Sequence, residues 1–179
     1  EEIKKTFSKI KSIDILINNA SVSDSYKDYL LNFDKTISIN LNGTFYCSHF
    51  SLSKLKKSKV KKIINISSIN AHVALPDNPG YIASKGGINA LTRSLALDYG
   101  KYKIKVNSLS LGYIKTGMSK KSYINKNTRK QRAENTILKK WGSENDVLNV
   151  VNFLISKSSD YITGTDMIID GGWIAKGLK

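Results

Sequence analysis

The 179-residue sequence has little cysteine, histidine, proline or arginine. Because Cys47 is its one cysteine, a disulfide framework within the chain and a cysteine metal cluster are excluded. The two histidines, His49 and His72, lack metal-ligand spacing, so no metal site is predicted. No run approaches the roughly 18 apolar residues of a membrane span, and no charged-then-apolar leader opens the chain. We therefore expect a reducing, cytoplasmic setting and no membrane partner.

Acidic residues are also few, and the formal net charge is +15, from 29 Lys and Arg against 14 Asp and Glu. An excess of this size is typical of chains that bind nucleic acid or an anionic surface. However, 26 of the 29 cations are lysines spread in ones and twos, whereas nucleic-acid sites favour clustered arginines interleaved with aromatic rings. We therefore expect a lysine-rich solvated surface and no nucleic-acid partner; a basic-surface binder is the weakest of the functional hypotheses.

Short β-branched runs alternate with longer helical segments along the chain, and both prolines fall in one loop. This alternation is typical of an α/β fold, a doubly wound parallel sheet with one layer of strands between helices. We expect residues 1–179 to form a single domain. The expected strands are 13–19, 61–67, 103–111 and 166–170, and the expected helices are 1–11, 81–99, 143–155 and 26–57, the last with an apolar stripe of Leu30, Phe33, Ile37, Leu41 and Phe45.

Parallel sheets bind ligands beyond the carboxyl ends of their strands, so the loops after Asn19, Ser67 and Leu111 are expected to carry the chemistry. Tyr81 and Lys85 form the most informative pair near these loops. At positions i and i+4 they share one helix face, and a cation beside a phenol favours the phenolate and lowers its pKa. The pair predicts an acid–base group; the alternative is an ordinary Tyr/Lys pair on a solvated helix face.

Six motifs follow one another along the chain: NNAS, NLNGTF, NISS, YIASK, VNSLSLGYIKTGM and ITGTDMIIDGGW. With this succession the chain resembles the classical short-chain dehydrogenase/reductase family from Glu1 to about Trp173. The resemblance implies a Rossmann-like doubly wound fold. It also implies an oxidoreductase that uses NAD or NADP to interconvert a secondary alcohol and a ketone by hydride transfer, with a tyrosine as acid and base.

The resemblance further implies roles for individual residues. Tyr81 would exchange a proton with the substrate oxygen, Lys85 would lower the Tyr81 pKa and bind the nicotinamide ribose, and Ser68 would orient the substrate oxygen. Asn40 would hold a water of the proton relay. Asp170-Gly171-Gly172 matches a structural signature of the family. The implied cofactor-binding set is Asn18, Asn19, Ala20, Tyr81, Lys85, Gly112, Ile114 and Thr116.

Three departures from the family pattern bear on the cofactor site. Leu111 replaces the usual proline before Gly112, which relaxes the backbone there, and Ser21 stands where the family has glycine. The third is the glycine-rich phosphate loop, because no such pattern occurs in the chain. We therefore expect an N-terminally truncated domain that lacks the first βαβ unit and by itself binds the dinucleotide poorly. The alternative is a non-catalytic fragment or interaction subunit of such an enzyme.

The sequence indicates the substrate and the partners only as broad classes. Residues 117–140 match the family's variable substrate lid, and the cations there either recognise an acidic substrate or form a solvated face. The resemblance implies a 3-oxoacyl-carrier-protein reductase or a dehydrogenase of a sugar or polysaccharide pathway. It also implies a homodimer or homotetramer formed through helices 26–57 and 79–100. The lid cations are Lys120, Lys121, Lys126, Arg129, Lys130 and Arg132.

Overall fold

The computed structural model describes residues 1–23 and 29–176. Within these residues, strands β1 (Ile15–Asn18), β2 (Lys62–Ser68), β3 (Lys105–Leu111) and β4 (Asp166–Ile169) form one parallel sheet in that order. Each strand is joined to the next by a crossover that contains at least one helix, as parallel strands require. The parallel α/β architecture predicted from the sequence is confirmed.

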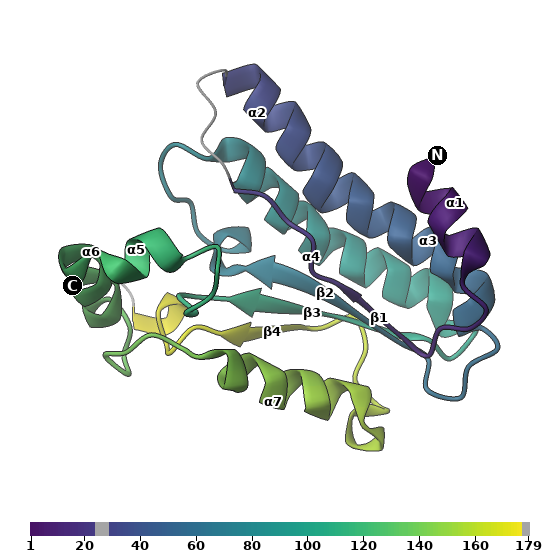
Figure 1. Cartoon of the computed structure of the whole chain (residues 1–179). Helices are drawn as coiled ribbons and strands as arrows, with labels where there is room; N and C mark the ends of the chain where they lie inside the picture. Colours follow the sequence, from purple (N-terminus) through teal and green to yellow (C-terminus); the bar gives the residue numbers. More distant parts are fainter. Residues whose placement is uncertain (24–28, 177–179) are drawn as a thin grey trace.

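Helices cover both faces of this sheet (Figure 1). Helices α2 (Tyr29–Thr36), α3 (Gly43–Leu55) and α4 (Pro79–Gly100) lie on one face, and α7 (Glu144–Ile155) lies on the other. The short helices α5 (Lys120–Ile124) and α6 (Lys126–Glu134) lie beyond the carboxyl ends of the strands. Helix α1 (Glu2–Lys9) packs against α3. The single 3₁₀ turns are η2 (Ile69–Ala71), η3 (Lys157–Ser159) and η4 (Ile174–Lys176).

Successive side chains of β2 enter hydrophobic clusters on opposite faces of the sheet, as the alternation of a strand dictates. Ile63 packs with Leu95 of α4, whereas Ile64 packs with Leu154 of α7, and all four side chains are almost fully buried. Burial on both faces explains why the apolar residues Ile63 and Ile64 stand next to each other in this strand. The first cluster also contains Leu55, Ala96, Tyr99, Ile104 and Val106, and the second contains Leu109.

The single helix predicted over 26–57 is interrupted by a π-helical segment, η1 (Ile37–Asn42), between α2 and α3; residues 26–28 lie outside the described residues. Three residues of the predicted apolar stripe are exposed, Leu30 (78%), Phe33 (38%) and Phe45 (40%), whereas Ile37 and Leu41 are half-buried. Small polar side chains are the buried residues here, and α4 lies very close: a Cβ on Gly80 of α4 would be 3.0 Å from the Phe33 Cα, and one on Gly87 would be 2.8 Å from the Leu41 side chain. The buried polar residues of these elements are Asn32, Thr36, Asn40, Thr44, Ser48 and Ser51.

The spacing Ser143-x-x-Asp146 in the sequence predicts a capping box at the start of the helix expected over 143–155. Ser143 and Asp146 form the predicted capping box at the start of α7, with Ser143 N donating to Asp146 Oδ2 over 2.7 Å. No helix in the described part of the chain is long and apolar enough to cross a membrane. Residues 1–23 and 29–176 also contain no group of three or more His, Cys, Asp or Glu side chains arranged to hold a metal ion.

Candidate active site

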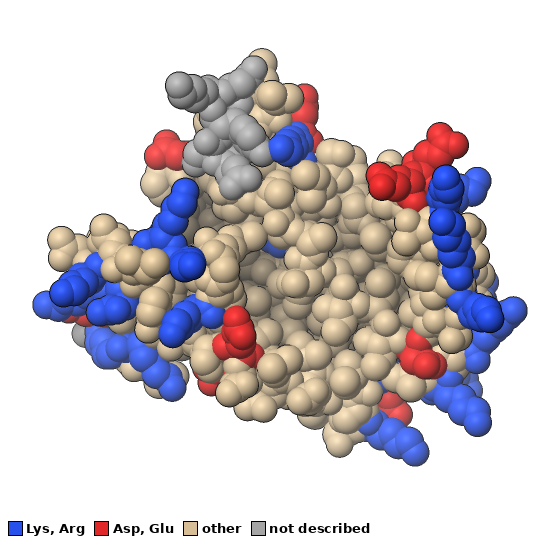
Figure 2. All heavy atoms as spheres, viewed as in Figure 1, with Lys and Arg blue, Asp and Glu red and all other residues tan. Residues whose placement is uncertain are grey.

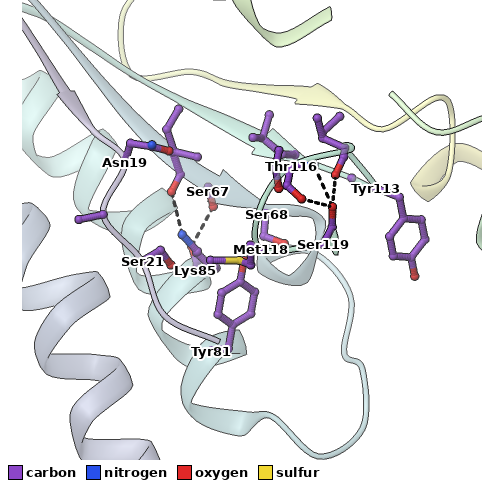
Figure 3. A pocket seen from close by; sticks show the side chains of 15 residues that line it. Asn19, Ser21, Ser67, Ser68, Tyr81, Lys85, Tyr113, Thr116, Met118 and Ser119 are labelled. Atoms are coloured by element: carbon purple, nitrogen blue, oxygen red, sulfur yellow. Dashed lines mark hydrogen bonds between the residues drawn. The ribbon is translucent and has the colours of Figure 1, made fainter. Parts of the chain in front are cut away.

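A pocket of about 500 Å³ lies at the carboxyl ends of β1, β2 and β3 (Figure 3). This is the edge at which open parallel sheets bind ligands. Four segments form its walls: residues 19–21 after β1, residues 66–68 at the end of β2, Tyr81 and Lys85 of α4, and residues between 111 and 119 after β3. The three loops expected to carry the chemistry therefore meet in one place.

Local capping brings Tyr81 into this pocket. Helix α4 begins at Pro79, whose missing N–H suits a first helical turn, and the Asn78 side chain accepts a hydrogen bond from the Tyr81 backbone N–H over 3.3 Å. Lys85 follows one turn later on the same face and is 98% buried. Its Nζ donates to the Ile66 carbonyl oxygen over 2.9 Å and lies 5.4 Å from the centroid of the Tyr81 ring.

Burial dominates the protonation of this pair. It raises the pKa of the Tyr81 phenol above its ordinary value of 10.0, and interaction with the Ser68 side chain lowers that pKa in part. Burial also lowers the pKa of the Lys85 ammonium to about 8. The sequence predicted a lowered Tyr81 pKa, and the structure gives a net rise. The reason is that desolvation disfavours the phenolate more than its surroundings favour it.

The two serines at the end of β2 have different surroundings. The Ser67 hydroxyl donates to the Lys85 carbonyl oxygen over 3.2 Å, which ties β2 to α4. Ser68 caps the 3₁₀ turn η2: its Oγ accepts from the Asn70 N–H over 3.2 Å and lies 3.3 Å from Asn70 Oδ1. Ser68 therefore shares the pocket with Tyr81, and the turn that follows it fixes its hydroxyl.

Asn40 lies beside the pocket rather than in its wall. It sits in the π-helical segment and is fully buried. Its Oδ1 accepts from Val22 N (2.9 Å), and its Nδ2 donates to Val22 O (3.0 Å) and to Ser84 Oγ (3.1 Å). Its carbonyl oxygen accepts from Thr44 Oγ1 over 2.7 Å. The side chain thus fastens the loop after β1 to α4.

The predicted cofactor residues of the first loop divide into two groups. Asn19 and Ala20 line the pocket. Asn18 lies below it, where its Nδ2 donates to Asn65 Oδ1 (2.8 Å) and to Ser48 Oγ (3.1 Å) and so joins β1 to β2 and α3. The contacts of Asn18 are therefore with the scaffold, because its amide protons point into the sheet and not toward the ligand edge.

The predicted residues after β3 all line the pocket: Gly112, Ile114 and Thr116. Gly112 is required by a close approach, because a Cβ there would lie 2.7 Å from the Cα of Asp170. Asp170 in turn accepts from the Gly172 and Ile174 N–H groups over 2.7 and 2.8 Å. The Asp-Gly-Gly signature therefore supports the pocket loop from behind.

Sequence reasoning missed several residues of the wall. Ser119 Oγ donates to the Ile114 carbonyl oxygen (2.6 Å) and accepts from Thr116 N (3.0 Å), so it folds the loop after β3. A serine three positions after Thr116 is a local turn signal that the motifs did not include. Met118 also lines the pocket. Ser21, which the sequence marked as a departure near the cofactor site, lines it too, and its buried hydroxyl has no hydrogen-bond partner among the described residues.

The lid region is anchored by aromatic rings. Tyr113 points away from Tyr81 and Lys85 (Figure 3) and stacks near Trp141, with ring centroids 5.5 Å apart. The Arg132 guanidinium lies 4.8 Å from the Tyr113 ring centroid. Figure 2 shows Lys and Arg gathered over α5 and α6, beside a hollow whose surface is largely uncharged. The predicted lid cations thus lie at the rim of this face.

Known proteins match both the sequence and the fold. The model of a family described as enoyl-(acyl carrier protein) reductase matches residues 1–174. The chain is 37% identical over 174 residues to an uncharacterized oxidoreductase, YxbG, of Bacillus subtilis, covering 92% of this chain and 63% of that protein. It is 35% identical to the 3-oxoacyl-[acyl-carrier-protein] reductase FabG of Rickettsia felis, covering 97% of this chain and 73% of that protein.

Two solved structures give the same result. A 4-hydroxyisoleucine dehydrogenase complexed with NADH matches with a TM-score of 0.90 and 34% identity, covering 98% of this chain and 75% of that chain. A gluconate 5-dehydrogenase of Burkholderia cenocepacia in complex with NADP and tartrate matches with a TM-score of 0.89 and 26% identity, covering 98% and 70%.

The fold and the pocket define an α/β protein with a ligand site at the carboxyl edge of a parallel sheet. The chain belongs to the short-chain dehydrogenase/reductase family. It spans 63% of the length of the Bacillus subtilis relative and 73% of that of the Rickettsia felis relative.

Proposed function

We propose that this chain carries the catalytic residues of an NAD(P)-dependent oxidoreductase that interconverts a secondary alcohol and a ketone. One observation carries the proposal: Ser68, Tyr81 and Lys85 line a single pocket, which also contains the Gly112 loop. A hydroxyl, a phenol and an ammonium beside one cavity supply hydrogen bonding and proton exchange at a carbonyl oxygen. Residues 1–179 would form one domain, with 117–140 as its substrate lid.

The pocket fits the nicotinamide riboside end of NAD or NADP. Its volume of about 500 Å³ lies in the usual range for ligand sites, and the buried Ser21 hydroxyl at its wall has no partner among the described residues. Relatives of similar fold are complexed with NADH or NADP. Lys85 and Asn19 would hold the ribose, and the carboxamide would be held by backbone and side-chain groups of Gly112, Ile114 and Thr116.

A bound nicotinamide ring would supply or accept the hydride. Tyr81 would give a proton to the carbonyl oxygen during reduction, and its raised pKa keeps the phenol protonated near neutral pH. Ser68 would donate a hydrogen bond to the same oxygen. Lys85 would hold its ammonium near the phenol, which favours the phenolate that remains after proton transfer. Asn40 would act by holding Val22 and Ser84 in place.

Tyr81→Phe tests this assignment in the full-length product of the reading frame that encodes this chain. We expect reduction of a panel of ketones, followed by loss of NADPH or NADH absorbance, to fall by about 10²- to 10⁴-fold, with cofactor affinity within a few-fold of wild type. Tyr161→Phe is the matched control, because Tyr161 is fully exposed. Turnover retained in Tyr81→Phe would refute the role of Tyr81. No turnover and no cofactor binding in the wild type would favour the non-catalytic alternative.

We also propose that the complete protein is a homodimer or homotetramer. Large apolar side chains are exposed on α2, α3 and α4, where Leu30 is 78%, Tyr46 45% and Leu97 83% exposed. A second copy would cover these faces. Leu97→Glu should then lower the mass measured by size-exclusion chromatography with light scattering. A wild-type protein that is monomeric at all concentrations would contradict this.

A further inference from the structure

A half-buried carboxylate outside the pocket gathers four hydrogen-bond donors. Asp166 is the first residue of β4, and its side chain is 15% exposed. Its Oδ1 accepts from Ser108 Oγ over 2.7 Å, and its Oδ2 accepts from Ser110 Oγ over 2.7 Å and from Asn89 Nδ2 over 3.0 Å. The fourth donor is His72, whose Nε2 lies 2.7 Å from Oδ2. An ionised carboxylate suits this arrangement, because it accepts at both oxygens and donates at neither.

The donors come from the elements that carry the pocket residues. Asn89 lies on α4 four and eight positions after Lys85 and Tyr81, so the three side chains share one helix face. Ser108 and Ser110 lie on β3, which ends just before Gly112 of the pocket loop. A single carboxylate therefore fixes α4 and β3 relative to β4.

His72 connects the same carboxylate to the turn that begins at Ser68. Ser68 is the N-cap of η2 and His72 is its C-cap, and the His72 N–H donates to the Ile69 carbonyl oxygen over 2.9 Å. Within the turn, the Asn70 N–H donates to Ser68 Oγ. Only the three residues of the turn thus separate Ser68 from His72, whose imidazole is anchored on β4, and backbone hydrogen bonds stiffen the path between them.

The geometry also assigns a proton to His72. A nitrogen without a proton would repel a carboxylate oxygen at 2.7 Å, so Nε2 carries the hydrogen and donates it to Asp166. Ser110 Oγ and Asn89 Nδ2 lie farther from Nε2, at 3.3 and 3.4 Å. Because the chain contains one other histidine, His49, this tautomer can be read directly from imidazole ¹⁵N resonances.

We propose that His72 and Asp166 form a positioning pair that anchors the η2 turn and so holds the Ser68 hydroxyl against Tyr81. Neither residue lines the pocket. Their contribution to catalysis rests on the proposed function, whereas their effect on the Ser68–Tyr81 interaction does not. The interaction has its own signature, because contact with Ser68 lowers the Tyr81 pKa against the rise caused by burial.

His72→Met removes the donor and keeps most of the side-chain volume, whereas His72→Gln places an amide N–H near the Nε2 position. The readout is the Tyr81 pKa, followed by ¹³C NMR of tyrosines labelled at Cζ and assigned with Tyr81→Phe. With the Met variant we expect this pKa to rise by about one unit, the equivalent of one ordinary hydrogen bond. With the Gln variant it should stay near the wild-type value. His49→Met, the same change at an exposed histidine on α3, is the control and should have no effect.

Turnover of the full-length protein gives a second readout. Displacement of a substrate-orienting hydroxyl should lower kcat about tenfold to a hundredfold in His72→Met, while the KM for the cofactor stays unchanged and His72→Gln restores kcat. If the wild type has no turnover, the proposed function fails. The Tyr81 pKa then still tests whether His72 and Asp166 position the Ser68 hydroxyl.

Two results would refute the positioning role of His72 and Asp166: a Tyr81 pKa that is unchanged in His72→Met, or a change in that pKa of equal size in the Met and Gln variants. If His72→Met does not fold, His72→Asn replaces it, because the shorter amide cannot reach Asp166 while the residue stays polar. In the Asn variant the Tyr81 pKa should then rise by the amount expected for the Met variant. A Tyr81 pKa equal to that of the wild type would refute the proposal in the same way.

Discussion

Lys85 is a buried cation whose cost to folding can be measured. Its side chain is 98% buried, and burial lowers its pKa from 10.5 to about 8. Each pKa unit corresponds to about 1.4 kcal/mol, so the protonated form costs the native state about 3 kcal/mol near neutral pH relative to the unfolded chain. The pocket therefore contains a charged group that folding disfavours.

Lys85→Met should consequently stabilise the chain near pH 7. The substitution removes the buried charge, a gain of about 3 kcal/mol, and loses the hydrogen bond from Nζ to the Ile66 carbonyl oxygen, a loss of about 1 kcal/mol. We expect a net gain of about 2 kcal/mol in the free energy of unfolding. The same variant should have little or no oxidoreductase turnover in the full-length protein.

The sign of the pH dependence makes the test sharper. Between the native pKa of about 8 and the unfolded pKa of 10.5, the unfolded chain binds a proton at Lys85 that the native chain does not. Wild-type stability should therefore rise with pH across this window because of Lys85, and the advantage of Lys85→Met should shrink by up to about 3 kcal/mol. Tyr81 is present in both proteins, so its own titration largely cancels in the difference.

Urea unfolding followed by circular dichroism at several pH values between about 7 and 10 measures this difference. Lys4→Met, at an exposed position of α1, is the control and should show no pH-dependent difference from wild type. Parallel stability curves for wild type and Lys85→Met would refute the reasoning, as would a large loss of stability at neutral pH.

Three other substitutions test the scaffold of the pocket by the same urea unfolding. Gly112→Ala should cost about 1–3 kcal/mol, because the new Cβ would lie 2.7 Å from Asp170 backbone; an unchanged midpoint would contradict the close approach. Asn40→Leu should cost about 3 kcal/mol by leaving the Val22 N–H and carbonyl unpaired, and a neutral effect would show that water replaces the amide. Ser143→Ala should cost only about 1 kcal/mol, the value of a helix cap, and a larger loss would indicate contacts beyond the capping box.

The strands and the long helices were predictable because each has a strong local signal. β2 contains the adjacent β-branched residues Ile63 and Ile64, which are buried on opposite faces of the sheet, and α7 starts at a capping box readable from Ser143 and Asp146. The helix over 26–57 was less predictable, because nothing in the sequence indicated the π-helical segment or which residues are buried: Leu30, Phe33 and Phe45 are exposed, and the buried residues are small and polar. Which face of an amphipathic helix is covered depends on its neighbours, and α4 approaches closely enough to favour small polar side chains there.

The sequence was sufficient to predict which loops form the site and that Tyr81 and Lys85 lie together in it. Tyr81 and Lys85 share a helix face by spacing alone, and the structure brings both into one pocket with Ser68. The protonation of the pair was not predictable, since the depth of burial, which sequence spacing does not contain, raises the Tyr81 pKa. Ser119 was missed for a related reason: its role depends on how the loop folds back on Ile114.

The motif residues differ in whether their side-chain donors are already used within the protein. Those whose donors are used support the pocket, and those with unpaired polar groups can bind a ligand. Asn18 donates its amide protons to Asn65 and Ser48, and Asn40 donates its own to Val22 and Ser84, so neither side chain has an N–H left to donate to a ligand. The Ser21 hydroxyl is the opposite case: it lines the pocket, is buried and has no partner among the described residues. A buried hydroxyl without a partner costs about 1–3 kcal/mol, and a ligand that accepts from it or donates to it would recover that cost. Ser21 therefore marks where a bound molecule gains most from a polar group on this side of the pocket.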